Sequence, residues 1–212
     1  MQLNQVKALV TGGVSGLGLA VTKYILANGG KAVMLDVNDE AGAAAEAETG
    51  ATYVRTDVTS EDGVIQSVAK AAELNGGLNV CMNCAGIIGA GRVLGREAPM
   101  PLSFFATTIS VNLVGSFNVA KAAADVMQHN EAMEDGEKGV IINTASVAAY
   151  EGQIGQAAYS ASKGGIVGMT LPMARELSRF GIRVMTIAPG IFWTPMVDGM
   201  PEHIQESLAA SI

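Results

Sequence analysis

Short segments that are apolar throughout alternate with helical segments along this chain, and the alternation limits the folds open to it. Apolar runs of this kind are typical of parallel strands covered on both faces. We expect strands at Val6–Thr11, Lys31–Asp36, Thr52–Arg55, Leu78–Met82, Val140–Thr144 and Arg183–Ala188. We expect helices between them, at Gly16–Asn28, Asp39–Thr49, Ser60–Leu74, Phe104–Gln128 and Tyr159–Phe180, and a further helix at Pro201–Ala210. The pattern predicts an α/β protein built on a doubly wound parallel sheet.

Length and charge narrow the classes of function. The 212 residues suffice for one sizeable core, and no linker or repeat divides them, so we expect a single domain over residues 1–212. A formal charge of −7 without a basic cluster argues against nucleic-acid binding. No uninterrupted apolar run approaches the ~18 residues of a membrane span. Met1–Gln5 shows no basic region of a secretion signal. We therefore expect a soluble cytoplasmic protein.

A glycine-rich turn joins the first strand to the first helix. Its sequence is Thr11-Gly-Gly-Val-Ser-Gly-Leu-Gly18, with the spacing Gly-x3-Gly-x-Gly. Glycines allow the close backbone approach that a pyrophosphate needs, and the helix N-terminus supplies N–H donors and a positive dipole end. Tight turns also need glycine, so the pattern by itself is weak. Between a strand and a helix it predicts a Rossmann-type dinucleotide site.

Asp36 ends the second expected strand, 18 residues after Gly18. A carboxylate at that place can accept hydrogen bonds from the adenosine ribose and would repel a 2′-phosphate. No Arg or Lys stands at positions 13–15, 37 or 38 to neutralise such a phosphate. The sequence therefore favours NAD over NADP. The alternative interpretation is that Asp36 caps a turn.

Tyr159 and Lys163 lie four residues apart in a helical segment, so both side chains fall on one helix face. A neighbouring ammonium favours the phenolate, and it would bring a tyrosine pKa down from ~10 toward neutral pH. Such a pair is a candidate proton-transfer device. A lone match of this spacing also arises by chance.

Other polar and sulfur residues have simpler interpretations. Cys81 and Cys84 form a C-x-x-C on an expected strand end, and we interpret them as two small buried side chains, since redox pairs begin helices. His129 and His203 stand in polar surroundings and are expected at the surface. Without a second cysteine pair or a nearby histidine, we expect no metal site.

These motifs together resemble the short-chain dehydrogenase/reductase family, and the resemblance covers nearly the whole chain. The matching elements follow the family's order. They are the glycine turn, Asp57-Val58, Asn83-Cys84-Ala85-Gly86, Asn112, Ser146, Tyr159-x3-Lys163 and Pro189-Gly190 followed by Thr194. The family usually has asparagine where Cys84 stands.

The resemblance implies a role for each matched residue. Ser146 would hold the substrate oxygen and Tyr159 would exchange its proton. Lys163 would bind the nicotinamide ribose, and Asn112 would hold a water that links Lys163 to solvent. In isolation, Ser146 could be a turn residue and Asn112 could face solvent. The implied cofactor contacts are Gly12, Ser15, Gly16, Leu17, Gly18, Asp36, Asp57, Val58, Asn83, Ala85, Gly86, Tyr159, Lys163, Pro189, Gly190, Ile191 and Thr194.

Within the family, Gly139–Gln153, Gln156–Gly165 and the polar insertion Gln128–Lys138 resemble type II 3-hydroxyacyl-CoA dehydrogenases, also called 17β-hydroxysteroid dehydrogenases type 10. The resemblance implies NAD-dependent oxidation of 3-hydroxyacyl-CoA thioesters, with Gln153 near the substrate and a homotetrameric assembly. It also implies a last strand and a substrate-covering segment after Ile212, so we expect this chain to be C-terminally truncated relative to the family.

Two regions differ from that subgroup, the loop Gly89–Pro101 and Trp193, and both should border the substrate pocket. Rival functions remain open. A hydroxysteroid dehydrogenase or a 3-oxoacyl-carrier-protein reductase would use the same core, although such reductases usually prefer NADP. A dinucleotide-binding sensor or scaffold without turnover would typically lack the tyrosine or the lysine.

Overall fold

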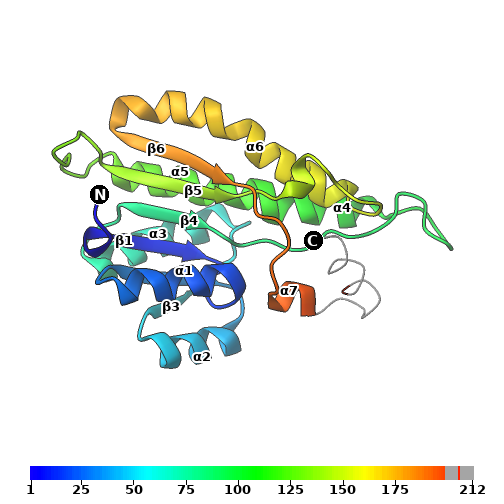
Figure 1. Cartoon of the computed structure of the whole chain (residues 1–212), viewed down its shortest axis with the longest axis horizontal. Helices are drawn as coiled ribbons and strands as arrows, with labels where there is room; N and C mark the ends of the chain where they lie inside the picture. The colour runs from blue at the N-terminus through cyan, green and yellow to red at the C-terminus, as the bar shows by residue number, and fades with distance from the viewer. Residues whose placement is uncertain (199–204, 206–212) are drawn as a thin grey trace.

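Six parallel strands form one sheet in the order β3-β2-β1-β4-β5-β6, in a computed structural model that describes residues 1–198 and 205 (Figure 1). The strands are β1 Lys7–Thr11, β2 Lys31–Asp36, β3 Thr52–Arg55, β4 Val80–Asn83, β5 Gly139–Thr144 and β6 Ile182–Ile187. All six predicted strands are confirmed, with ends shifted by at most two residues. The helix predicted at Pro201–Ala210 and the surface position predicted for His203 lie outside the described residues.

Helices lie on both faces of the sheet (Figure 1). Helices α1 Gly16–Ala27 and α2 Asp39–Thr49 lie on one face, and α3 Glu61–Asn75, α5 Gly115–Met127 and α6 Ala157–Leu177 lie on the other. The remaining elements are η1 Leu3–Gln5, α4 Leu102–Ile109, η2 Ser110–Val114, η3 Val147–Ala149, η4 Ser178–Phe180 and α7 Pro195–Asp198. The predicted α/β doubly wound fold is confirmed.

The helix predicted as one element at Phe104–Gln128 consists of three consecutive segments. Between α4 and α5, the residues Ser110–Val114 form a π-helical turn. Periodicity does not reveal such a turn here, because in a segment as apolar as Leu102–Met127 the shift caused by one extra residue is hard to recognise. Among the described helices, the continuous stretch Leu102–Met127 is the one long and apolar enough to cross a membrane. Here its α5 part packs against β4 and β5, as core helices of globular proteins do.

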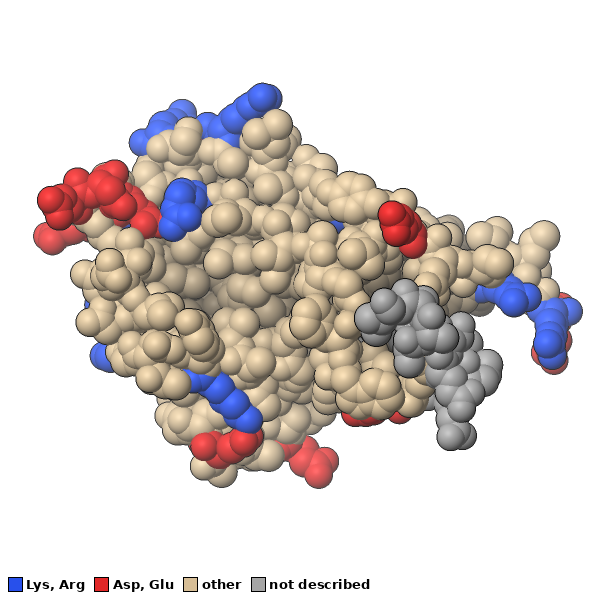
Figure 2. All heavy atoms as spheres, viewed as in Figure 1, with Lys and Arg blue, Asp and Glu red and all other residues tan. Residues whose placement is uncertain are grey.

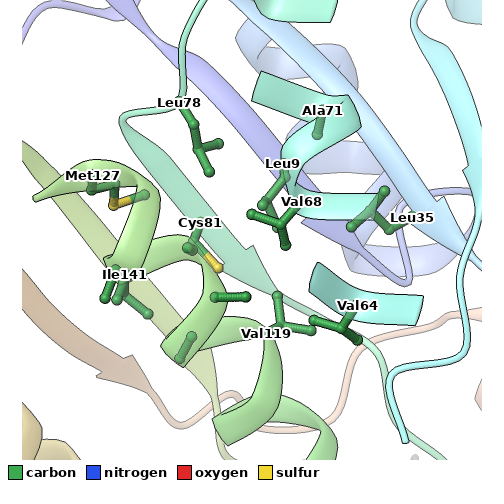
Figure 3. Packing of buried hydrophobic residues seen from close by; sticks show 14 of the residues in the cluster. Leu9, Leu35, Val64, Val68, Ala71, Leu78, Cys81, Val119, Met127 and Ile141 are labelled. Atoms are coloured by element: carbon green, nitrogen blue, oxygen red, sulfur yellow. The ribbon is translucent and has the colours of Figure 1, made fainter. Parts of the chain in front are cut away.

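The main core lies between the sheet and helices α3 and α5 (Figure 3). Leu9 and Ile141 project from the strands toward Val68 and Val119 of these helices, and all four side chains are buried. Cys81 belongs to this cluster, and burial raises the pKa of its thiol well above the ordinary value. The interpretation of Cys81 as a small buried side chain is therefore confirmed.

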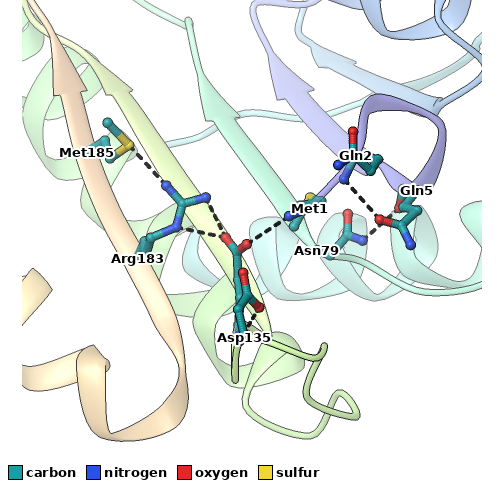
Figure 4. Close-up of polar contacts among 8 residues, drawn as sticks. Met1, Gln2, Gln5, Asn79, Asp135, Arg183 and Met185 are labelled. Carbon is teal, nitrogen blue, oxygen red and sulfur yellow. Dashed lines mark hydrogen bonds and ion pairs between the residues drawn. The ribbon is translucent and has the colours of Figure 1, made fainter.

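Charged side chains lie toward the periphery of the face shown in Figure 2, and His129 is exposed as predicted. One carboxylate is an exception, because Glu137, just before β5, is buried. Its Oε1 accepts from Arg183 Nη2 at 2.5 Å and from Nε at 2.8 Å, while the Met1 amino group lies 3.4 Å from Oε2 (Figure 4). This cluster joins the N-terminal residues and the segment before β5 to β6.

Candidate active site

A cavity of about 470 Å³ lies at the carboxyl ends of the strands. Strand order reverses between β1 and β4, and open α/β sheets bind ligands at such a switch point. Residues predicted from eight separate stretches of sequence line this one cavity. They are Gly12, Ser15, Gly16, Leu17, Gly18, Asp36, Asp57, Val58, Ala85, Gly86, Ser146, Gln153, Tyr159, Lys163, Pro189, Gly190, Ile191 and Thr194.

The glycine turn has the geometry that an anion cradle needs. Gly12 has φ +61°, and a Cβ at Gly18 would lie 2.2 Å from the Gly12 carbonyl oxygen, so helix α1 could not start this close to β1 with a side chain there. Ser15 is the N-cap of α1, and its side chain makes no capping hydrogen bond. The first N–H groups of α1 are therefore available to a phosphate.

Acidic and apolar residues line the part of the cavity at the ends of β2 and β3. The Asp36 carboxylate accepts from the Asn38 backbone N–H at 3.1 Å, so it also makes the turn contact of the alternative interpretation. Asp57 accepts from the Thr59 N–H and hydroxyl, and these bonds hold the pKa of its carboxyl below the ordinary range. Val58 is fixed by the Asn118 side chain, which donates to its carbonyl.

Asn83 lies behind the cavity, although it was predicted as a cofactor contact. It is buried, and its Nδ2 donates to Ser116 O at 3.1 Å and to Asn143 Oδ1 at 2.9 Å. Thr11 Oγ1 accepts from the backbone N–H groups of Cys84 and Ala85 at 3.1 Å each. The asparagine and threonine thus shape the end of β4, which presents Ala85 and Gly86 to the cavity.

The first turns of α6 carry the predicted proton-transfer pair. Lys163 Nζ lies 5.6 Å from the centroid of the Tyr159 ring and donates to the Thr144 carbonyl at 2.7 Å. Within the described chain, this carbonyl is the one hydrogen-bond acceptor of a buried ammonium that carries three donors. The remaining donors fit the hydroxyls of a ribose, and together with the glycine turn they make the cavity fit a nicotinamide dinucleotide.

The electrostatics of the pair correct one expectation. Burial raises the pKa of the Tyr159 phenol above its ordinary value, and a hydrogen bond with the Ser146 side chain opposes that rise. Burial also lowers the pKa of Lys163, to about 8. The prediction that Lys163 brings the tyrosine pKa down is therefore wrong for the protein chain itself, because burial is the largest influence on the Tyr159 pKa and the side chain that lowers it is Ser146.

Asn112 lies in the π-helical turn and outside the cavity lining. Its Oδ1 accepts from Ile87 N at 2.8 Å, and its Nδ2 donates to Ile87 O and to Ser162 Oγ at 3.0 Å each. The side chain is fully buried, so the interpretation of Asn112 as solvent-facing is wrong. Asn112 thus joins the segment after β4 to α6 at Ser162, three residues after Tyr159, and the Ser162 hydroxyl in turn donates to the Tyr159 carbonyl.

Several lining residues were not predicted as cofactor or substrate contacts, among them Cys84, which was interpreted as a buried side chain, and Glu151 and Gln156. Cys84 is half-buried, and its sulfur accepts from the Thr144 hydroxyl at 3.7 Å. Glu151 and Gln156 line the cavity near Gln153, and Gln156 Oε1 accepts from the Gln153 N–H at 2.9 Å. The available signal was the position of Gln156, three residues before Tyr159 at the start of a helix.

Comparisons with known proteins agree with this geometry. The family model described as short chain dehydrogenase matches residues 6–205. Two relatives are named 3-hydroxyacyl-CoA dehydrogenase type-2. The one from Bos taurus is 48% identical over 97% of this chain and 80% of the relative, and the one from Drosophila melanogaster is 46% identical over 97% and 82%.

A crystal structure of 3-hydroxyacyl-CoA dehydrogenase type-2 from Mycobacterium avium is also similar. It has a TM-score of 0.91 and 40% identity, and the match covers 99% of this chain and 83% of that one. The sequence, the sheet order and the cavity thus lead to one assignment. This chain belongs to the short-chain dehydrogenase family of oxidoreductases.

Proposed function

We propose that this oxidoreductase interconverts 3-hydroxyacyl-CoA and 3-oxoacyl-CoA with NAD. One observation carries the reaction type: Ser146, Tyr159 and Lys163 line the same cavity as the glycine turn. The substrate class is supported by the names of the relatives, which are 46–48% identical to this chain. The glycine turn and the tyrosine–lysine pair are both intact, which counts against a non-catalytic sensor.

The residues divide the chemistry between them. Oxidation of a secondary alcohol removes a proton from oxygen and a hydride from carbon, and a bound nicotinamide supplies the hydride acceptor. The Tyr159 phenolate takes the hydroxyl proton, and the Ser146 hydroxyl holds the substrate oxygen. In reduction the Tyr159 phenol returns the proton, and its raised pKa keeps that proton in place at neutral pH.

The preference for NAD is supported by Asp36. Its carboxylate lines the cavity at the end of β2, where it can accept hydrogen bonds from ribose hydroxyls and would repel a 2′-phosphate. Replacing Asp36 by alanine should weaken NADH binding and relax discrimination against NADPH. The ratio of kcat/KM values for NADH and NADPH measures this, and an unchanged ratio would remove Asp36 from the role.

The direct test follows nicotinamide absorbance with acetoacetyl-CoA and NADH or NADPH. We expect oxidation of NADH, and we expect Tyr159→Phe to keep cofactor binding while losing turnover by about 10³-fold or more. Near wild-type rates in purified Tyr159→Phe would contradict the mechanism. Turnover of steroid or carrier-protein substrates without turnover of the CoA thioester would replace the proposed substrate.

We also propose that the chain self-associates as a homotetramer. Large apolar side chains are exposed on neighbouring helices: Val114 in η2, Phe117 in α5 and Leu171 in α6. Apolar surface of this kind is typical of subunit contacts. Light scattering on wild type and on Phe117→Glu should give a smaller mass for the variant, and a monomeric wild type would contradict the proposal.

A further inference from the structure

A cation that sequence reasoning overlooked stands beside the adenosine part of the cavity. Arg55 ends β3, and its register partner on β2 is Asp36. Neighbouring strands lie about 4.8 Å apart, well within the reach of an arginine side chain. Arg55 Nη1 donates to the carbonyl of Val37 at 3.0 Å, and Val37 lines the cavity.

The guanidinium is held by Asp39, the first residue of α2. Arg55 Nη1 donates to Asp39 Oδ2 at 2.5 Å. The other carboxylate oxygen, Oδ1, accepts from the Tyr53 hydroxyl at 2.9 Å. Tyr53 and Arg55 are two apart on one strand and so project to the same side. Both oxygens of Asp39 are therefore engaged, and the carboxylate is fixed where it neutralises the arginine.

Arginine is the side chain that accommodates a 2′-phosphate in dinucleotide sites, because its planar donors match phosphate oxygens. We propose that Asp39 sets coenzyme preference as a positioning residue, by holding Arg55 away from an otherwise available subsite for an adenosine 2′-phosphate. This inference rests on the proposed NAD-dependent function. Asp36 and Asp39 then exclude the phosphate in two ways, since one repels it directly and the other occupies the cation that would bind it.

The experiment measures binding, independently of turnover. Fluorescence titrations with NADH and NADPH give the two dissociation constants of each protein. The proteins are wild type, Asp36→Ala, the double variant Asp36→Ala/Asp39→Asn, and a triple variant that adds Arg55→Ala to the double variant. Adenosine 2′,5′-bisphosphate serves as a competing ligand. Glu48→Gln in the Asp36→Ala background is the matched control, because it removes one charge from another exposed ion pair of α2, with Lys23.

We expect Asp39→Asn to tighten NADPH binding about tenfold beyond Asp36→Ala, the ratio typical of one charge-assisted hydrogen bond, with little change for NADH. Arg55→Ala should abolish that gain, Glu48→Gln should not produce it, and added salt should reduce it. A gain that persists without Arg55, or no gain at all, overturns the inference alone. Failure of wild type to bind NADH overturns both the inference and the proposed function.

Discussion

At the residue scale, desolvation governs the chemistry of this site. Tyr159 and Lys163 each lose water on folding, and each is thereby shifted toward its neutral form. A neutral phenol is ready to give a proton to a carbonyl, whereas oxidation must first remove that proton. The hydrogen bond from Ser146 opposes the burial effect at Tyr159, so Ser146 acts on the base as well as on the substrate.

This balance predicts a pH dependence. Because the Tyr159 pKa is raised, kcat/KM for alcohol oxidation should increase with pH across the neutral and alkaline range. Ser146→Ala removes the interaction that lowers this pKa, so the rising limb of the profile should move to higher pH. Initial rates over a pH series measure the shift. If kcat/KM of the variant fell at every pH without a shift of the rising limb, Ser146 would hold the substrate but would not act on the Tyr159 pKa.

The buried ammonium of Lys163 is expected to lower stability while it supports activity. Lowering the pKa of Lys163 from 10.5 to about 8 corresponds to about 3 kcal/mol of destabilisation of the charged form. Loss of the hydrogen bond to Thr144 offsets about 1 kcal/mol. Lys163→Met should therefore raise the free energy of unfolding by about 2 kcal/mol while abolishing turnover.

The size of this effect changes with pH in a defined way. Below pH 8 the folded protein bears the full cost of the charged lysine. Between about 8 and 10.5 the unfolded state binds more protons, so the wild type gains stability as pH rises. The advantage of Lys163→Met in denaturant unfolding should shrink over that window, and a constant difference would contradict it.

At the element scale, the π-helical turn between α4 and α5 decides where Asn112 lies. Its side chain is fully buried. It accepts a hydrogen bond from the Ile87 N–H and donates one to the Ile87 carbonyl. Such turns are frequent at functional sites. Here the turn fixes the segment after β4 against α6, and with it the walls around Gly86 and Lys163.

Removing this side chain should be costly. Asn112→Ala leaves the Ile87 N–H and carbonyl without their partner, and we expect a loss of about 3 kcal/mol in the free energy of unfolding, together with reduced turnover. Asn28→Ala is the control, because its side chain makes one exposed bond to the Tyr24 carbonyl and should change stability by less than about 0.5 kcal/mol. Equal changes in the free energy of unfolding would show that the buried hydrogen bonds of Asn112 contribute no more to stability than one exposed bond.

Sequence patterns predicted the strands, the helices, the glycine turn and the Tyr159–Lys163 pair, because each depends on short-range order, and the family resemblance supplied most of the other predicted cavity residues. Apolar runs and helical periodicity report burial directly. What could not be predicted depends on contacts between distant segments. Asn83 belongs to a family motif, yet its side chain lies behind the cavity. Arg55 reaches the adenosine region only because β3 pairs with β2. The pKa directions likewise depend on burial, which no local spacing reveals.

At the scale of the whole molecule, Glu137 and Arg183 hold the outer strand β6 to the segment before β5. Glu137 is buried while the Arg183 side chain is 55% exposed, so water weakens the pair. Arg183→Met would leave a buried carboxylate without its main partner and should cost about 1–2 kcal/mol of stability.

The matched control for that variant is Lys70→Met. It removes a cation from a pair with Glu73 in which both side chains are largely exposed, and it should alter the free energy of unfolding by less than about 0.5 kcal/mol. Denaturant unfolding of both variants measures the contrast. If Arg183→Met lowered the free energy of unfolding no more than Lys70→Met, the Glu137–Arg183 pair would contribute little to stability.

The placement of Tyr159 and Lys163 on consecutive turns of one helix restricts how such a protein can diverge. A single residue inserted or deleted between them would swing one side chain by about 100° around the axis of α6. No exchange of side chains elsewhere could undo that rotation. Mutational drift can therefore remodel the loops around the cavity mouth and change what the enzyme accepts, while a reading-frame-preserving indel within these five positions ends its chemistry.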